Sequence, residues 1–343
     1  MKTFISLSAL FLSLSLTAQT NPATWYLNDT SGNGIQSNNN IASGIASTAM
    51  GLATTASGDY STAMGLATTA SGDYSTAMGR GTTAYEDYSI AMGYDTTASG
   101  IASTAIGENT EASGDYSTAM GLATTASGDY STTMGRGTTA YEDYSTAFGR
   151  NTTASGIVST AMGLATTASG KYSTTVGFYT TASDRSSLVI GQYNLLGSTV
   201  TNSATDFSTD NTAFVIGNGA DSDNRSDALV VKFNGDATLA GNLNINSDAR
   251  LKANIVSLGS TLSKLLQIDG KSYTMKKDES EKQKIGLLAQ DIEKVFPELV
   301  SESHGVKSVN YQGLVPVLIN ALKEQQSEID ELKTMLKAII EKT

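Results

Sequence analysis

The stretch Ser61-Thr-Ala-Met-Gly-Leu-Ala-Thr-Thr-Ala-Ser-Gly-Asp-Tyr74 is one unit of a 14-residue repeat that runs from Ile41 to about Tyr193. A glycine recurs at the same place in every unit, from Gly51 to Gly191. Fourteen residues are too few for a helix-turn-helix unit, whereas two short strands joined by glycine corners with positive φ fit this length. The repeat therefore predicts a parallel β-roll with one rung per unit, and its second glycine column is expected at the other corner.

Three further columns predict where side chains lie. Alanines from Ala42 to Ala182 fit a thin roll that has room inside only for small side chains. An apolar column, mostly methionine, runs from Met50 to Ile190, and two interpretations stay open: a subunit interface, or the core of the single chain. Threonines from Thr54 to Thr180 are expected on a solvated β-face, with ordering of water or ice by that face as the alternative.

Tyrosines and aspartates also recur in the repeat. For the tyrosines, packing between rungs and a glycan-stacking ladder are both open; they are Tyr60, Tyr74, Tyr88, Tyr116, Tyr130, Tyr144 and Tyr172. Asp59, Asp73 and Asp115 raise the question of calcium, but the Gly-Gly-x-Gly-x-Asp signature of calcium-binding rolls is missing. We therefore expect no metal site in the roll.

The repeat pattern S-x-A-x-G-x-x-x-x-A-x-G resembles the head repeat of YadA-type trimeric autotransporter adhesins. The resemblance covers about 150 residues and eleven copies. It implies a left-handed, trimeric roll that binds a surface, a matrix protein or a glycan.

The composition changes at Ser247. Residues 1–246 hold 8 Lys/Arg against 19 Asp/Glu, whereas residues 247–343 hold 14 of each. Two modules with different composition are expected, joined by a β connector over 195–246. In the second module Leu288, Ile292, Val295 and Leu299 share a helical face that Pro297 must end.

Residues 315–340 are predicted to form a coiled coil. Apolar residues there alternate in steps of three and four, and the seam consists of Val315, Leu318, Leu322, Gln325, Ile329, Leu332, Leu336 and Ile339. Such a seam requires partner helices, and a homotrimer suits the head. Gln325 either fixes the register of the helices or is merely tolerated.

Residues 247–343 resemble the intramolecular chaperone of endosialidases and other phage tail spikes, through the motifs at 247–255, 285–300 and 309–323. The resemblance implies a domain that trimerises, helps the upstream fibre to assemble and then cuts itself off. The matching residues are Ser247 as nucleophile and Lys252 as its base, with cleavage of the Asn246–Ser247 bond.

The proposed pair sets physical conditions. A lysine with an ordinary pKa near 10.4 is almost never neutral at pH 7, so it becomes a base only when desolvated, for example by trimer formation. Five residues along an ideal helix do not share a face, so Ser247 must be non-helical or the helix entry bent. The alternative is that Ser247 or Asp248 caps a helix whose Arg250 and Lys252 are solvated.

Composition excludes several functions. One histidine and no cysteine exclude the common zinc sites and Cys–His nucleophiles, and no P-loop or dinucleotide motif predicts a cofactor. The net charge of −11 argues against nucleic acid. Residues 1–19 read as an export signal, followed by an N-terminal segment at 20–40, and no other apolar run is long enough to span a membrane.

Together these patterns predict a mainly β, exported protein at the cell surface or outside the cell. A β-roll at 41–194 precedes the connector and a mixed α/β chaperone with a coiled coil at 247–343. The one enzymatic act is a single-turnover self-cleavage by a Ser–Lys serine peptidase. The alternatives are a phage tail-fibre or tail-spike component, and an uncleaved trimeric surface-binding protein.

Overall fold

A computed structural model describes residues 26–27, 35–36, 39–197, 204–276 and 282–341. The expected export signal at 1–19 lies outside these residues. The chain divides between Asn242 and Leu243 into two compact units. No helix within the described ranges is long and apolar enough to cross a membrane.

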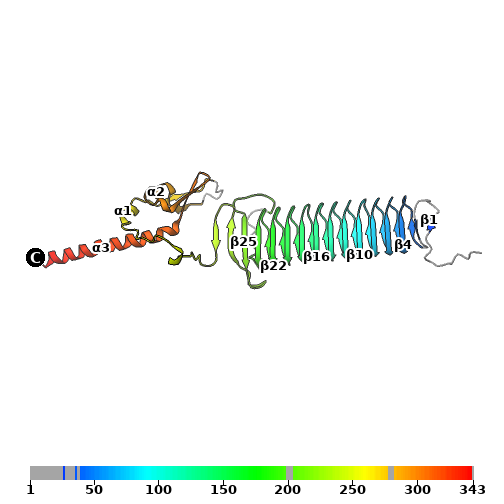
Figure 1. Cartoon of the computed structure of the whole chain (residues 1–343), viewed down its shortest axis with the longest axis horizontal. Coiled ribbons are helices and arrows are strands. Elements are labelled where there is room, and N and C mark those ends of the chain that lie inside the picture. The colour runs from blue at the N-terminus through cyan, green and yellow to red at the C-terminus, as the bar shows by residue number, and fades with distance from the viewer. Residues whose placement is uncertain (1–25, 28–34, 37–38, 198–203, 277–281, 342–343) are drawn as a thin grey trace, which may run out of the picture. The chain divides into compact units, whose positions relative to one another are not determined.

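The first unit is a parallel β-solenoid with one long and one short strand in each rung (Figure 1). The long strands are β4 (Thr48–Leu52), β6 (Thr62–Leu66), β8 (Thr76–Arg80), β10 (Ile90–Tyr94), β12 (Thr104–Glu108), β14 (Thr118–Leu122), β16 (Thr132–Arg136), β18 (Thr146–Arg150), β20 (Thr160–Leu164), β22 (Thr174–Phe178) and β24 (Leu188–Gln192). The short strands are β3 (Ile41–Ala42), β5 (Thr55–Ala56), β7 (Thr69–Ala70), β9 (Thr83–Ala84), β11 (Thr97–Ala98), β13 (Glu111–Ala112), β15 (Thr125–Ala126), β17 (Thr139–Ala140), β19 (Thr153–Ala154), β21 (Thr167–Ala168) and β23 (Thr181–Ala182).

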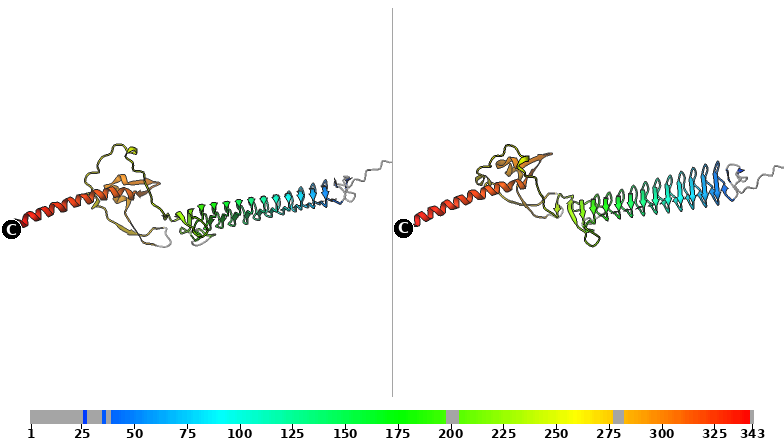
Figure 2. Two further views of the ribbon diagram at one scale, coloured as in Figure 1. Left: turned by 90° about the horizontal axis from the view of Figure 1, so that it is seen from below. Right: turned by 60° about the horizontal axis from the view of Figure 1, so that its bottom comes forward.

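Neighbouring rungs pair in the register that the repeat predicts. Met50 lies opposite Met64, and Gly51 opposite Gly65, and pairings 14 residues apart continue to β24 in the long strands and to β23 in the short ones. The long strands belong to a 16-stranded sheet and the short strands to an 11-stranded sheet, which form the two sides of the roll (Figure 2). The predicted parallel β-roll is confirmed.

Small side chains fill the interior of the solenoid. The alanine column that includes Ala42 and Ala56 is fully buried, as predicted, and a second column that includes Ala49 and Ala63 joins it. The threonines from Thr54 to Thr180 are buried as well, so the prediction of a solvated threonine face was wrong. These threonines follow a left-handed corner residue, which turns them into the roll instead of outward.

The methionine column lies on the outer surface of the 16-stranded sheet. None of its side chains is buried, and Met134, Phe148, Met162 and Val176 are 36–48% exposed. The interpretation that this column fills the core of the single chain is therefore wrong. An interface between subunits remains the open interpretation.

The two glycine columns serve different purposes. Gly65 has φ +131, and an added Cβ would lie 1.8 Å from the carbonyl oxygen of Gly79. Gly58 has no positive φ, contrary to the prediction, but its Cβ would lie 2.0 Å from the oxygen of Gly72. The left-handed corners are instead formed by non-glycine residues such as Ala53 and Tyr60, each with φ 57.

Further strands extend both ends of the 16-stranded sheet. At its N-terminal end β1 (Tyr26–Leu27) pairs antiparallel with β2 (Ile35–Gln36). At its C-terminal end β25 (Thr212–Asn218) pairs parallel with β24, and β26 (Asp227–Lys232) and β27 (Ala237–Leu239) follow antiparallel. The Arg225 guanidinium stabilises this end of the sheet because it donates hydrogen bonds to the carbonyl oxygens of Tyr179 (3.0 Å) and Asn194 (3.1 Å).

The second unit is a small mixed α/β domain that ends in a long helix. Its elements are η1 (Ala249–Leu251), α1 (Leu262–Leu265), β28 (Lys271–Tyr273), β29 (Lys284–Gly286), α2 (Ala289–Val295), η2 (Pro297–Leu299), β30 (Val300–Ser303), β31 (Val306–Val309), η3 (Tyr311–Gly313) and α3 (Leu314–Ile340). Its core centres on Ile292, Phe296 and Val317. The helix α2 ends at Val295, with Phe296 as its C-cap, so it stops before Pro297 as predicted, but Leu299 lies in η2 and not on this helix.

Candidate active site

A short 3-10 turn forms the candidate site. Ser247 has no regular secondary structure, and Asp248 caps η1 by accepting a hydrogen bond from the Arg250 amide at 2.9 Å. The Arg250 guanidinium also binds the Asp248 carboxylate, with Nη2 to Oδ2 at 2.6 Å. The bonds from the Arg250 side chain and amide hold the pKa of Asp248 below its ordinary value, and the Arg250 pKa is raised in return.

This turn brings Lys252 back to Ser247. The Leu251 amide donates to the Asp248 carbonyl and the Lys252 amide to the Ala249 carbonyl, each at 3.1 Å. Lys252 Nζ then lies 2.7 Å from Ser247 Oγ, to which it donates a hydrogen bond. The contact meets the geometric condition set by the sequence, since Ser247 is non-helical and the turn is tighter than an α-helix.

Both interpretations of the segment 247–252 are visible in this geometry. Asp248 does cap a helical turn, and the Arg250 side chain is 88% exposed. Lys252 is also exposed, but its amine donates a hydrogen bond to the Ser247 hydroxyl. Capping by Asp248 and pairing of Ser247 with Lys252 are therefore compatible, because the cap forms the turn that joins the pair.

A second cluster links the segment after the site to α3. The carboxylate of Glu324 accepts hydrogen bonds from Ser260 Oγ at 2.6 Å and from the Leu262 amide at 3.2 Å, and it also accepts from the Thr261 amide. The Ser260 hydroxyl is the largest cause that lowers the pKa of Glu324. Sequence reasoning missed this residue because its partners lie more than 60 positions away and share no motif with it.

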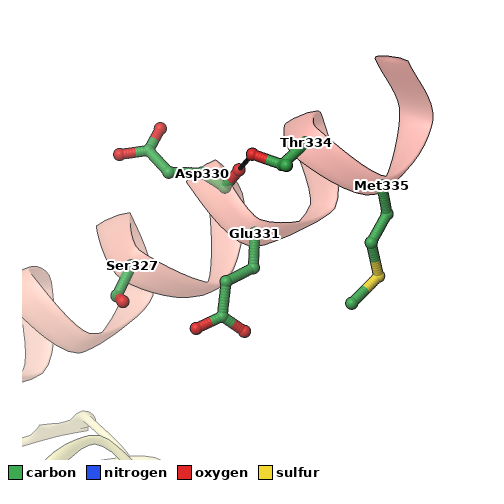
Figure 3. A pocket seen from close by; sticks show the side chains of 5 residues that line it. All are labelled: Ser327, Asp330, Glu331, Thr334 and Met335. Atoms are coloured by element: carbon green, nitrogen blue, oxygen red, sulfur yellow. Dashed lines mark hydrogen bonds between the residues drawn. The ribbon is translucent and has the colours of Figure 1, made fainter. Parts of the chain in front are cut away.

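The two faces of α3 differ in chemistry. The predicted seam is exposed on one face, including Leu318 (51%), Leu322 (67%) and Leu332 (65%). Residues away from the seam line an open hollow, shown in Figure 3, and they are Ser327, Asp330, Glu331, Thr334 and Met335. All five belong to α3, so among the residues that the structure describes the hollow is lined by this helix alone.

The tyrosine and aspartate columns are occupied by contacts between rungs. Tyr60, Tyr74 and Tyr88 stack with ring centroids 4.9 and 5.2 Å apart, which confirms packing between rungs. Tyr74 is stacked on both of its ring faces, whereas Tyr60 and Tyr88 each stack on one. Asp73 Oδ1 accepts a bond from the Asp59 amide at 2.8 Å. Within the described ranges no group of three or more metal-binding side chains occurs.

Comparison with known families agrees with this architecture. Residues 42–67, 70–96, 98–124, 125–152 and 154–180 match the YadA head domain repeat, and residues 247–301 match the chaperone of endosialidase. The chain therefore carries YadA head repeats followed by an endosialidase-type chaperone domain.

The relatives are fibre proteins. The long tail fiber protein Gp37 of Salmonella phage S16 is 32% identical over 32% of this chain and 16% of its own length. The Gp37 proteins of Enterobacteria phages M1 and Ox2 are each 37% identical, over 27% and 26% of this chain and 40% and 39% of their own lengths. The chain is thus tail-fibre-like, and it spans less than half the length of each relative.

Proposed function

We propose that the chain is an exported, homotrimeric, adhesin-like fibre whose C-terminal unit aligns the three β-rolls and then cuts itself off between Asn246 and Ser247. The observation that carries the cleavage is the 2.7 Å contact between Lys252 Nζ and Ser247 Oγ. It lies at the first residues of the segment that matches the chaperone of endosialidase.

The chemistry follows from the position of Ser247 next to the bond to be cut. Neutral Lys252 takes the hydroxyl proton, and Ser247 Oγ attacks the carbonyl carbon of Asn246. The C–N bond then breaks as the C–O bond remains, Lys252 returns the proton to the leaving amine, and an ester joins the two residues. Water hydrolyses this ester, which leaves a carboxylate on Asn246 and a free amine and hydroxyl on Ser247.

Assembly supplies the missing condition for this reaction. Ser247 and Lys252 are exposed in the single chain, so the environment that favours a neutral amine must come from neighbouring subunits. The exposed seam of α3 provides the means to bring three chains together. Cleavage therefore follows trimerisation.

The repeat explains why such a fibre needs a C-terminal unit that aligns the three chains and is then removed. Rungs of nearly the same sequence let one subunit slip by 14 residues against another with little loss of contact. A C-terminal trimer fixes the starting alignment. The fibre that remains after cleavage binds its target through the head, for which a surface, a matrix protein or a glycan is the proposed class of partner.

Two substitutions test the cleavage. Purified wild-type chain should yield a fragment from Ser247 to Thr343, whereas Ser247→Ala and Lys252→Ala should each remain intact by mass spectrometry. Lys337→Ala, which removes an exposed lysine from α3, should be cut normally. Wild-type chain that stays intact after assembling into trimers would overturn the self-cleavage.

The comparison with phage fibres favours a second candidate, a fibre carried by a virion. The N-terminus of mature protein separates the two. Material that begins near Gln19 supports export through the segment at 1–19, whereas virion-bound material that retains Met1 supports the tail fibre.

A further inference from the structure

Three arginines and two glutamates of the repeat lie on opposite edges of the solenoid. Arg80, Arg136 and Arg150 each end a long strand, directly before the first corner of the rung. Glu86 and Glu142 lie in the opposite corner, between a short strand and the next long strand. Figure 2 shows that these corners form two separate edges along the roll. The first edge therefore presents the three arginines together with Asp95 and Glu108, and the second edge is mainly acidic, with Lys171 and Arg185 as its cations.

These charges are not satisfied within the subunit. All five side chains belong to exposed residues, and none of them forms an ion pair with any residue of the described ranges. Arg80 lies over the ring of Tyr94, 5.2 Å from its centroid. The other four have no polar partner for their charged groups in the solenoid, so the fold of one chain does not explain them.

The two glutamates occupy positions that the roll fills with glycine in the other rungs, apart from Asp184 in the last one. At the equivalent Gly58 a Cβ would lie 2.0 Å from the next carbonyl oxygen, so a larger residue in this column has to shift the corner. Glu86 and Glu142 nevertheless stand there, in segments 79–89 and 135–145 that have the same sequence. Each segment also carries one of the arginines, so the opposite charges recur together every 56 residues.

The surface beside the arginines suits contact with another copy. Met134 and Phe148, in the adjacent outward column, are 36% and 48% exposed. In a cyclic trimer each subunit applies one edge to the other edge of its neighbour, because ring interfaces are heterologous. Arginines on one edge that meet glutamates on the other edge fit this arrangement.

We propose that Arg80 and Arg136 of one subunit pair with Glu86 and Glu142 of the next, and that these pairs set the axial register of the β-roll trimer. The inference rests on the homotrimer proposed above. Three-fold symmetry places identical residues at one height, and six positions separate each arginine from its glutamate, less than half a rung along the chain.

The residues that occupy the position of Arg80 differ from rung to rung, so this column distinguishes one register of the trimer from another. In the aligned trimer both glutamates face arginine. A slip by one rung in one direction places Glu86 opposite Tyr94 and Glu142 opposite Arg150. A slip in the other direction places them opposite Leu66 and Leu122. A slip by two rungs places Glu108 opposite one of them, which is repulsive. Slips of one to four rungs thus retain at most one of the two pairs.

Charge reversal in the full chain tests the pairing. Arg80→Glu/Arg136→Glu and Glu86→Arg/Glu142→Arg should each lower the melting temperature of the trimer by several degrees at low salt. The fourfold variant should recover most of the loss. At about 1 M salt, where screening acts over about 3 Å, the differences should shrink. Unchanged melting in the twofold variants, or no recovery in the fourfold one, would overturn the pairing.

Disulfide trapping tests the register itself, because the chain has no cysteine. Arg136→Cys/Glu142→Cys should give chains linked into trimers under mild oxidation, and more of them than Leu122→Cys/Glu142→Cys, which is displaced by one rung. The opposite order would refute the alignment. All variants keep Ser247 and α3. If the wild type forms a cleaved trimer but the charge reversals do not change its melting temperature, only this inference is refuted. If the wild type is a monomer, the proposed trimer is refuted.

Discussion

Gly121 and Ala123 lie two residues apart at one corner of the roll. Both have a positive φ, but only Ala123 has space for a side chain. Gly121 has φ +129, and a Cβ there would lie 2.0 Å from the oxygen of Gly135. Ala123 has φ 52, a left-handed conformation that disfavours any Cβ. The repeat therefore contains one position where a methyl group does not fit and one where it is tolerated under strain.

This pair gives a prediction with an internal control. Gly121→Ala should lower the free energy of unfolding by roughly 3 kcal/mol or more, through clash and backbone strain. Ala123→Gly should change it by no more than about 1 kcal/mol, since relief of strain offsets the flexibility that glycine adds. Urea unfolding followed by circular dichroism measures both, and equal losses would contradict the account.

Single residues also show the limits of prediction from sequence. The period of 14 located every column, but it does not say which columns face inward. Thr54 was assigned to the surface because threonine is common on exposed strands, yet the narrow roll buries it. Ser247 and Lys252 were named from their motif, whereas the Asp248–Arg250 contact that shapes their turn emerges only from the geometry.

At the scale of elements, α3 illustrates a helix that was well predicted. Its heptad seam was assigned from spacing alone, and the structure shows a 27-residue helix with that seam exposed. Its contact with α1 was not predicted, because Glu324 receives its hydrogen bonds from a loop far away in sequence. Periodicity reveals the faces of an element, but not the distant segments that a polar residue will meet.

Charges placed in the seam should separate the chains. Ile329→Glu/Leu332→Glu should abolish both trimerisation and cleavage, because the pair at Ser247 then stays exposed. Ser327→Glu/Thr334→Glu adds the same charge away from the seam, on the face in Figure 3, and should preserve both. Sedimentation and mass measurement give the two readouts. Efficient processing of a monomeric seam variant would show that one subunit suffices.

Glu324 should make the packing of α1 on α3 sensitive to acid. Hydrogen bonds hold its pKa below the ordinary 4.5, so its stabilisation is complete above that value and is lost as the pH falls through the lower, folded-state pKa. In an uncut Ser247→Ala background, Glu324→Gln should lower the melting temperature at pH 7, and the difference should narrow on acidification. Glu328→Gln, on the same helix, is the control.

At the scale of the whole molecule, the route of assembly matters as much as the final fold. Each rung pairs only with the rungs before and after it, whereas in the proposed trimer the alignment of three chains depends on the C-terminal unit and on a few Arg–Glu pairs. The proposed cleavage would remove the information that this unit supplies during assembly. The mature fibre would then be held by a kinetic barrier.

Refolding should reveal this loss. Uncut Ser247→Ala chains, denatured and diluted, should regain trimers, whereas cleaved heads should return largely as monomers or mixed registers. Adding the separated C-terminal fragment should not restore the cleaved heads, because it no longer tethers the chain ends. Equal recovery of cut and uncut material, measured by sedimentation, would mean that the roll aligns itself.

The in-register stacking of the rungs bears on how the length of such a fibre can change. Removing or duplicating one whole repeat leaves every hydrogen-bonding pattern intact, since each strand meets a neighbour with nearly the same backbone and sequence. Recombination between repeats would thus alter the reach of the head in steps of about 4.8 Å per rung. Because the Arg–Glu segments recur every four rungs, recombination between them would change the length of the roll by about 19 Å. Each such step would add or remove one of the proposed Arg–Glu pairs.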